Sequence, residues 1–171
     1  MSGVAKMATR CTITVQSTEG KKYCIYRHHD GNPECVVSDL RLFMQFYKRS
    51  PVEDPEYFLA NFICMAKMHI LYVYLGTRIG VMEVVRAEPG SSWRELILSS
   101  YGVCAPDCEH DDLEYKYLIY PINGKVMLKI EKFNYESRAF REVFNDEIEE
   151  AFKRWVREDG CHLRREWLPS S

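Results

Sequence analysis

The stretch Tyr115–Ile130, with the sequence YKYLIYPINGKVMLKI, decides the fold class. On each side of Asn123-Gly124, apolar and aromatic residues recur at every second position, as they do in strands that bury one face. A type I′ turn needs positive φ at two consecutive positions, which Asn and Gly tolerate, so Asn-Gly between alternating runs is a strong hairpin signal. The stretch therefore predicts a β-hairpin.

A second hairpin is predicted near the N-terminus. Cys11–Val15 alternates with the period of a strand, Ser17–Gly20 is typical of a turn, and Lys21–Arg27 supplies the returning strand. The segment Asp30-Gly31-Asn32-Pro33 is a dense turn signal, because Asp and Asn bond to their own backbone, Gly supplies positive φ and Pro fixes its own. The second strand is therefore expected to end near His29.

Two helices are predicted after this hairpin. Apolar residues recur at helical spacing from Val36 to Tyr47, and Ser50-Pro51 ends that helix. Asp54-Pro55-Glu56 favours the start of the second helix, with an N-cap acid, Pro at the first helical position and an acid in the first turn. That helix is expected to continue to about Leu75 and to pack on more than one face.

The remaining segments predict a third long helix, one short helix and, as an alternative, a pair of short strands. Ile70–Leu75 also has the β-branched and aromatic content of a strand, which would pair with Ile79–Val85, and this alternative stays open. Ser91–Glu95 has the spacing of a capping box and predicts a short helix. From Glu136 onward, apolar residues follow one helical stripe to Trp155, so a third main helix is expected there.

Together these elements predict an α+β fold with a mostly antiparallel sheet of two hairpins, a candidate fifth strand and three main helices. The 171 residues suit a single domain, 1–171, with residues 1–8 as a flexible tail. A net charge of −2 argues against broad binding to nucleic acid. The apolar runs are too short for a signal peptide or a membrane span, so a cytoplasmic protein with no membrane partner is expected.

The densest polar segment is Tyr26–Gly31, with the sequence YRHHDG. If the first hairpin turns on two residues, Arg10 lies opposite Arg27. In a pairing register shifted by two positions, Arg10 lies opposite His29 instead. Cations directly opposite each other destabilise a strand pair unless an acid or a bound anion lies between them. Asp30 is the local acid, so two interpretations stay open: an Arg27–Asp30 structural pair, or a site for a phosphate or carboxylate.

The loop before the second hairpin is another candidate site. It carries His110, Asp111 and Asp112. A His beside carboxylates suits a general base with its orienting acid, and it also suits half of a metal site. Acids just before a strand are equally typical of a solvated surface. The catalytic interpretation gains force if this loop meets the Tyr26–Gly31 segment.

The seven cysteines are odd in number, and no secretory signal accompanies them. This argues against a complete disulfide framework, so free thiols are expected. A Cys11–Cys24 bridge is the alternative if those strands are neighbours.

A zinc site is a further alternative for the cysteines. Cys104, Cys108 and His110 offer thiolate and imidazole ligands, and Cys161-His162 could complete the set. The paired Cys-x2-Cys spacing of structural zinc sites is absent, so no metal and no cofactor is expected. Reduced thiols or a local disulfide between Cys104 and Cys108 are the alternatives that stay open.

Three motifs occur in order between Met7 and Phe133: the strand opened by Thr9-Arg10, the segment YRHHDGNP at Tyr26–Pro33, and Asp112–Tyr117. In these motifs the chain resembles a family of small uncharacterised proteins from phages, archaeal viruses and prokaryotic genomes. Members open with a Thr-Arg strand and carry a Tyr-Arg-His-x-Asp-Gly-Tyr-Pro segment. The resemblance implies no known activity. It implies a common polar framework of Arg10, Arg27, His28, Asp30, Gly31, Pro33, Asp112 and Tyr115.

The leading functional hypothesis is a binding or interaction module of viral or mobile-element origin that holds an anionic small molecule or an acidic group of a protein partner. Its expected ligand-binding residues are Arg10, Arg27, His28, Gly31 and Tyr115. Self-association through an exposed edge strand, giving a homodimer, is a further alternative.

The runner-up is an enzyme that acts on a phosphate ester or nucleotide. Its general acid or base would be His29 or His110, oriented by Asp30 or Asp112. Arg10 and Arg27 would then clamp the developing negative charge.

Overall fold

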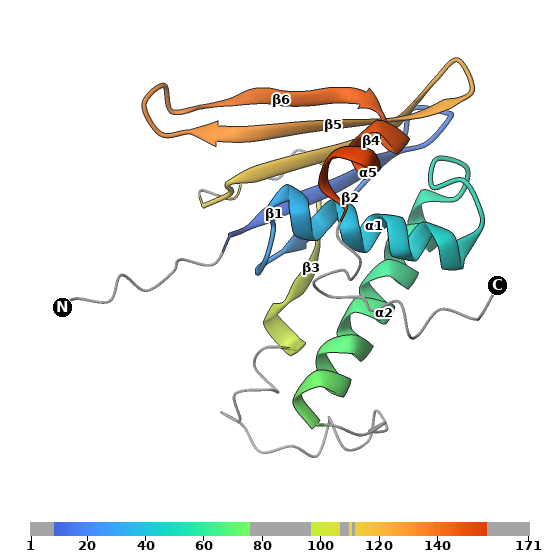
Figure 1. Cartoon of the computed structure of the whole chain (residues 1–171), viewed down its shortest axis with the longest axis vertical. Coiled ribbons are helices and arrows are strands. Elements are labelled where there is room, and N and C mark those ends of the chain that lie inside the picture. The colour runs from blue at the N-terminus through green and yellow to red at the C-terminus, as the bar shows by residue number, and fades with distance from the viewer. Residues whose placement is uncertain (1–8, 76–96, 107–109, 111, 157–171) are drawn as a thin grey trace.

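The computed structural model describes residues 9–75, 97–106, 110 and 112–156. Strands and helices both occur, which confirms the α+β class (Figure 1). The element order is β1 (Cys11–Gln16), β2 (Lys22–Arg27), α1 (Pro33–Tyr47), α2 (Pro55–Leu75), β3 (Tyr101–Cys104), β4 (Tyr115–Ile122), β5 (Lys125–Asn134), β6 (Ala139–Glu147) and α5 (Ile148–Trp155).

The strands of the described residues form one six-stranded sheet in the order β3-β2-β1-β4-β5-β6. Neighbouring strands are antiparallel except β1 and β4, which run parallel with Cys11 opposite Tyr115. The sheet is therefore mixed: it contains the two predicted hairpins, but it also has a parallel pair and more strands than the two hairpins and the candidate fifth strand would supply. The parallel pair arises because β4 adds to the free edge of β1, next to the N-terminal hairpin.

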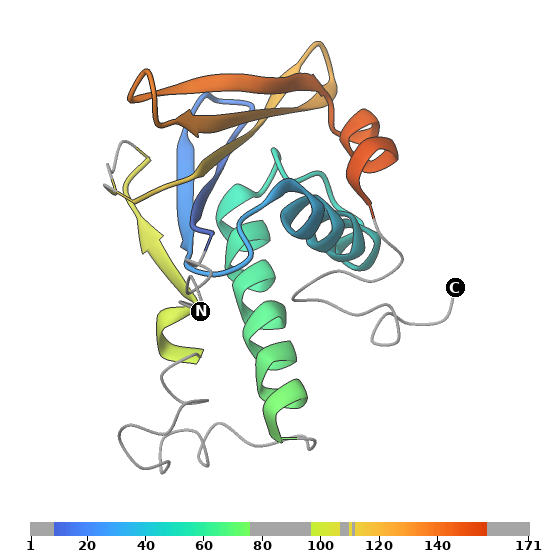
Figure 2. The ribbon, with the colours of Figure 1, turned by 60° about the vertical axis from the view of Figure 1, so that its left-hand side comes forward.

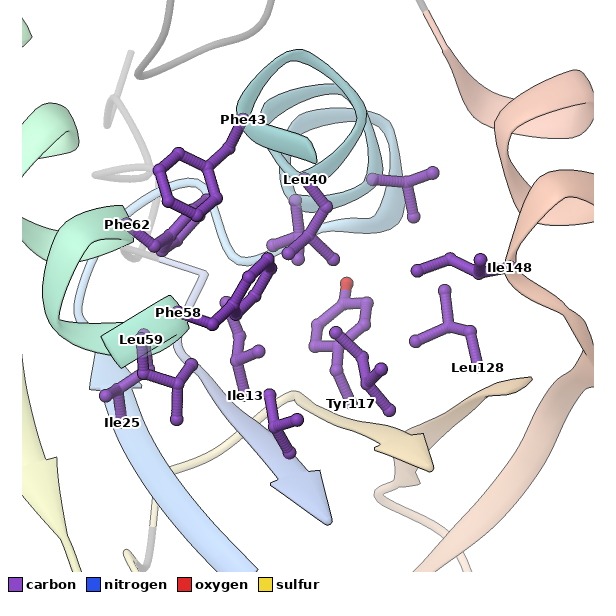
Figure 3. Packing of buried hydrophobic residues seen from close by; sticks show 14 of the residues in the cluster. Ile13, Ile25, Leu40, Phe43, Phe58, Leu59, Phe62, Tyr117, Leu128 and Ile148 are labelled. Atoms are coloured by element: carbon purple, nitrogen blue, oxygen red, sulfur yellow. The ribbon is translucent and has the colours of Figure 1, made fainter. Parts of the chain in front are cut away.

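The helices α1, α2 and α5 lie on the same face of this sheet (Figures 1 and 2). The core between the two layers is apolar and aromatic, with Leu40 and Phe43 from α1 meeting Phe58 and Phe62 from α2 above Ile13 (Figure 3). These five side chains are fully buried. The opposite face of the sheet carries no helix among the described residues.

Both predicted hairpins are present. Asn123 and Gly124 have φ of 51° and 77°, as the two-residue turn requires. The predicted start of the second helix is also confirmed, and α2 continues to Leu75, so the helical alternative is the correct one there. α2 buries one stripe of side chains and leaves Tyr57 and Met68 more than half exposed, so it packs less fully than expected.

The C-terminal prediction was wrong in part. Residues Ala139–Glu147, expected in a long helix from Glu136, form strand β6, and helix starts only at Ile148. β3 was not predicted at all. The predicted elements at 79–85 and 91–95 lie outside the described residues.

The register of the first hairpin also differs from the expectation. Cys11 is opposite Arg27, so paired residue numbers sum to 38 rather than 37 or 39. The reason is a five-residue connection, in which the Ser17 backbone N–H donates to the Lys21 carbonyl and Gly20 has a φ of +85°. A slip of one residue reverses the faces of a strand, so this connection decides where the cations point.

No helix within the described part of the chain is long and apolar enough to cross a membrane.

Candidate functional site

The first hairpin and the segment before β4 meet at one corner of the sheet. Because β1 and β4 run parallel, the residues just before each strand lie side by side. The Arg10 carbonyl accepts hydrogen bonds from the backbone N–H of Glu114 at 3.0 Å and of Tyr115 at 3.3 Å. The Arg10 guanidinium forms an ion pair with the Asp112 carboxylate, and both side chains are partly exposed.

Aromatic and imidazole rings surround this ion pair. The Tyr26 hydroxyl and the His28 Nδ1 are hydrogen-bonded at 2.9 Å. The Tyr26 ring stacks on His110 with centroids 4.5 Å apart, and His28 meets His29 edge to face at the same distance. We call Arg10, Tyr26, His28, His29, His110 and Asp112 the corner cluster. It unites the two segments that the sequence marked separately.

The corner cluster centres on the helix-free face of the sheet. Tyr26 is opposite Thr12 in the β1–β2 pairing, whereas the neighbouring pair, Cys11 and Arg27, points to the helices. Successive residues of a strand alternate between faces, so Tyr26 and Arg27 are separated by the sheet. The predicted crowding of Arg10 and Arg27 is therefore absent.

Arg27 is instead part of the core. Its guanidinium is completely buried and donates through Nη1 to the Asp39 carboxylate of α1 at 2.7 Å and through Nε to the His29 carbonyl at 2.8 Å. The ring of Tyr101 lies 6.0 Å from it. The structural interpretation of Arg27 thus fits its position, but its ion-pair partner is Asp39 rather than Asp30.

The turn after β2 has a positioning role. Asp30 adopts a φ of 53°, and the Gly31 N–H donates to the Thr9 carbonyl at 2.9 Å. The Gly31 carbonyl accepts from the Tyr117 hydroxyl at 2.7 Å. Asn32 caps α1 by accepting from the Cys35 N–H. These contacts account for Gly31 without a ligand and bring His28 and His29 to the sheet corner.

Tyr115 lies near the cluster through its backbone only. It is opposite Cys11 and so belongs to the face that carries the helices. Its ring stacks on Tyr117 at 6.2 Å and lies under the Lys132 ammonium at 5.6 Å. Its side chain is therefore not one of the groups that the corner cluster brings together.

Charge in the corner cluster depends on the protonation of His28 and His29. Burial lowers the pKa of His28, and His29 and Arg10 lower it further. Burial also lowers the pKa of His29, against the opposing effect of Asp30. Near neutral pH both imidazoles are uncharged, so Arg10 is the permanent cation. Its Nε is buried and has no hydrogen-bond partner among the described residues.

The cysteines do not form a metal site in the described part of the chain, where no group of three or more His, Cys, Asp or Glu side chains is placed to hold an ion. Cys108, Cys161 and His162, which the zinc alternative requires, lie outside that part. Cys11 and Cys24 are separate thiols, so the alternative bridge between them is not formed. Cys35 is disulfide-bonded, contrary to the expectation of free thiols.

Two residues of this region were missed from the sequence. Tyr26 could have been found by strand alternation, because it lies two positions before His28 and therefore on the same face. Asp39 lies three positions after Val36 and four before Phe43, which places an acid within the apolar stripe of a helix. An acid at such a position indicates a buried cationic partner.

Comparison of the chain with protein families, curated proteins and solved structures gave no match. The corner cluster itself is therefore the basis for a functional inference.

Proposed function

We propose that this protein is a binding module whose corner cluster accepts a small anion, a carboxylate or a phosphate, at Arg10. The observation that carries the proposal is the exposure and the incomplete hydrogen bonding of the Arg10 guanidinium. It is partly exposed, it shares one nitrogen with an exposed carboxylate, and its buried Nε donor has no partner among the described residues. A guanidinium satisfies its donors best with a bidentate oxyanion.

Asp112 occupies the position that an external anion would take. Exposed ion pairs contribute only about 0–1 kcal/mol, so exchange of the Asp112 carboxylate for a ligand oxygen costs little. Rotation of the Arg10 side chain would let a bound oxyanion take up Nε together with an Nη. The Tyr26 hydroxyl and the imidazoles of His28 and His110 offer further donors at the same corner.

Anion binding of this kind should strengthen as pH falls. The lowered pKa values of His28 and His29 keep both rings neutral near pH 7. Protonation below the ordinary range of histidine adds positive charge beside Arg10 and converts both ring nitrogens into donors.

The enzymatic alternative has weaker support. Its clamp needs Arg10 and Arg27 on one ligand, whereas Arg27 is fully buried and paired with Asp39 on the other face of the sheet. We therefore favour binding over acid–base catalysis.

The test is a thermal-unfolding titration with sodium phosphate and, separately, sodium citrate, against sodium chloride at equal ionic strength. Wild-type protein should gain about 3 °C in Tm when the probe reaches ten times its Kd. Arg10→Gln should abolish the gain, and the matched control Arg141→Gln, an exposed arginine of β6, should keep it.

Asp112→Asn separates an anion site from a merely structural ion pair. Removing the internal carboxylate leaves Arg10 without its competitor, so phosphate should bind this variant more tightly than wild type. Equal shifts in wild type and Arg10→Gln would overturn the proposal. Weaker phosphate binding by Asp112→Asn would do the same.

A further inference from the structure

Two cysteines face each other across the β2–β3 pair. Cys24 is directly opposite Cys104, and the Cys104 Sγ lies 3.1 Å from the Cys24 Sγ. Directly opposite residues of antiparallel strands have Cα atoms about 4.5–5.5 Å apart, which lies within the range that a disulfide spans. The two sulfurs need to approach by only about 1 Å to reach a disulfide bond length.

We propose that Cys24 and Cys104 form a reversible disulfide that ties the edge strand β3 to β2 when the protein meets a low-molecular-weight disulfide such as oxidised glutathione. β3 has four residues, β2 is its one neighbouring strand among the described residues, and Val103 within it is 85% exposed. A covalent link is therefore placed at an edge strand of the sheet that the described residues form.

The exposure of the two thiols sets the order of reaction. Cys104 is partly exposed, whereas Cys24 is buried. The Cys104 thiolate attacks one sulfur of the glutathione disulfide, which forms a mixed disulfide and releases one glutathione thiolate. The Cys24 thiolate then attacks the Cys104 sulfur and expels the second glutathione. Two protein thiols are oxidised, one glutathione disulfide is reduced to two thiols, and both protein protons pass to glutathione.

The surroundings of Cys24 suit the second step. Its sulfur accepts a hydrogen bond from the Thr14 hydroxyl at 3.3 Å, which supports a developing thiolate. Cys11 offers a contrast on the other face of β1, because burial raises the pKa of its thiol to about 12 and keeps it protonated. Cys64 is exposed on α2 and serves as a matched reference for simple surface reactivity.

The experiment equilibrates the full chain in glutathione buffers of graded oxidation, quenches with acid and alkylating reagent, and maps disulfides by mass spectrometry without reduction. A Cys24–Cys104 cross-linked peptide should appear as the buffer becomes more oxidising and disappear on return to reduced glutathione. Wild-type Tm should rise by roughly 5–10 °C on oxidation, because the bridge closes a loop across an 80-residue separation.

Variants define the outcomes. Cys104→Ser should lose both the cross-link and the oxidative gain in Tm, and Cys64→Ser should keep both. If Cys104→Ser does not fold, the wild-type peptide map still decides the question. The proposal is overturned if glutathione remains attached to Cys104 as a stable mixed disulfide, if Cys104 pairs with a different cysteine, or if both thiols stay open to alkylation throughout the series.

Discussion

At Gly31 the backbone passes so close to β1 that an added Cβ would lie 2.9 Å from both the Cys11 Cβ and the Thr9 carbonyl oxygen. Gly31→Ala should therefore destabilise the protein by about 1–3 kcal/mol through overpacking. Gly102→Ala is the matched control, since its Cβ would meet only the Tyr26 Cβ at 4.0 Å. Urea unfolding measures both, and an equal effect of the two substitutions would contradict this account.

The buried Arg27–Asp39 pair makes a second prediction at the residue scale. Asp39→Ala leaves an uncompensated guanidinium in the core and should cost about 3–5 kcal/mol in the free energy of unfolding. The exposed Lys153–Glu150 pair is the control, and Glu150→Gln should cost less than about 0.5 kcal/mol.

A double replacement tests whether charge isolation is the cause of that loss. Arg27→Met combined with Asp39→Leu removes both charges together and should recover most of the stability lost in Asp39→Ala. A double variant no more stable than the single one would show that shape rather than charge dominates at this position.

Two histidines of the corner cluster, His28 and His29, predict a pH dependence. Their pKa values are lowered by burial in the folded protein, so between the folded value and about 6.5 the unfolded chain binds more protons. The two neutral imidazoles therefore contribute fully to the free energy of unfolding above about pH 6.5, and this contribution decreases as pH falls toward their folded pKa values. His28→Gln should lose less stability than wild type between pH 7.5 and 5.5, measured by urea unfolding. An unchanged difference between the two proteins would contradict the assignment.

Among the elements, α1 begins with an N-cap that can be recognised in the sequence. The Asn32 side chain accepts from the Cys35 N–H at 3.1 Å, and Pro33 occupies the first helical position. Asn32→Ala should cost about 1 kcal/mol, because one backbone donor loses its partner. Asn61→Ala on the exposed surface of α2 should be neutral or slightly stabilising. Thermal unfolding of the two variants distinguishes a capping effect from a general effect of losing Asn.

Elements with local signals could be predicted, and those defined by distant partners could not. The Asn123-Gly124 turn and the start of α2 at Pro55 can be predicted from residues that are neighbours in the sequence. β6 was mistaken for helix because Phe140 and Phe144 are four apart, as on one helical face. In the sheet the register shifts between Ile130 and Glu131, so that Phe144 lies opposite Ile130 and Phe140 opposite Phe133, on opposite faces. The four-residue spacing therefore does not mark a shared face here.

The corner cluster shows the same limit at the scale of the whole molecule. Both of its segments were marked from the sequence by their charges and imidazoles. Their meeting depends on the parallel β1–β4 pair, which joins residues far apart in the chain. Arg27 was misplaced for a related reason, since a five-residue connection rather than a two-residue turn decides its face.

Position in the sheet should govern local stability in the reduced protein. β1 pairs with β2 on one side and β4 on the other, and its core-facing residues Cys11, Ile13 and Val15 are fully buried. Its amides should exchange with deuterium only through global unfolding. Within the described part of the chain, β3 and β6 each have one neighbouring strand, so every second amide of these strands has no partner strand and the ends can fray.

Hydrogen exchange followed by mass spectrometry checks this order. Amides of β1 should exchange at least about 100-fold more slowly than those of β3, although β1 has only six residues. The comparison with β6 is the sharper one, because β6 has nine residues and would be the more protected strand if length decided protection. Protection of β6 equal to that of β1 would show that the β5–β6 ribbon opens together with the central sheet, and the edge position would then carry no local instability.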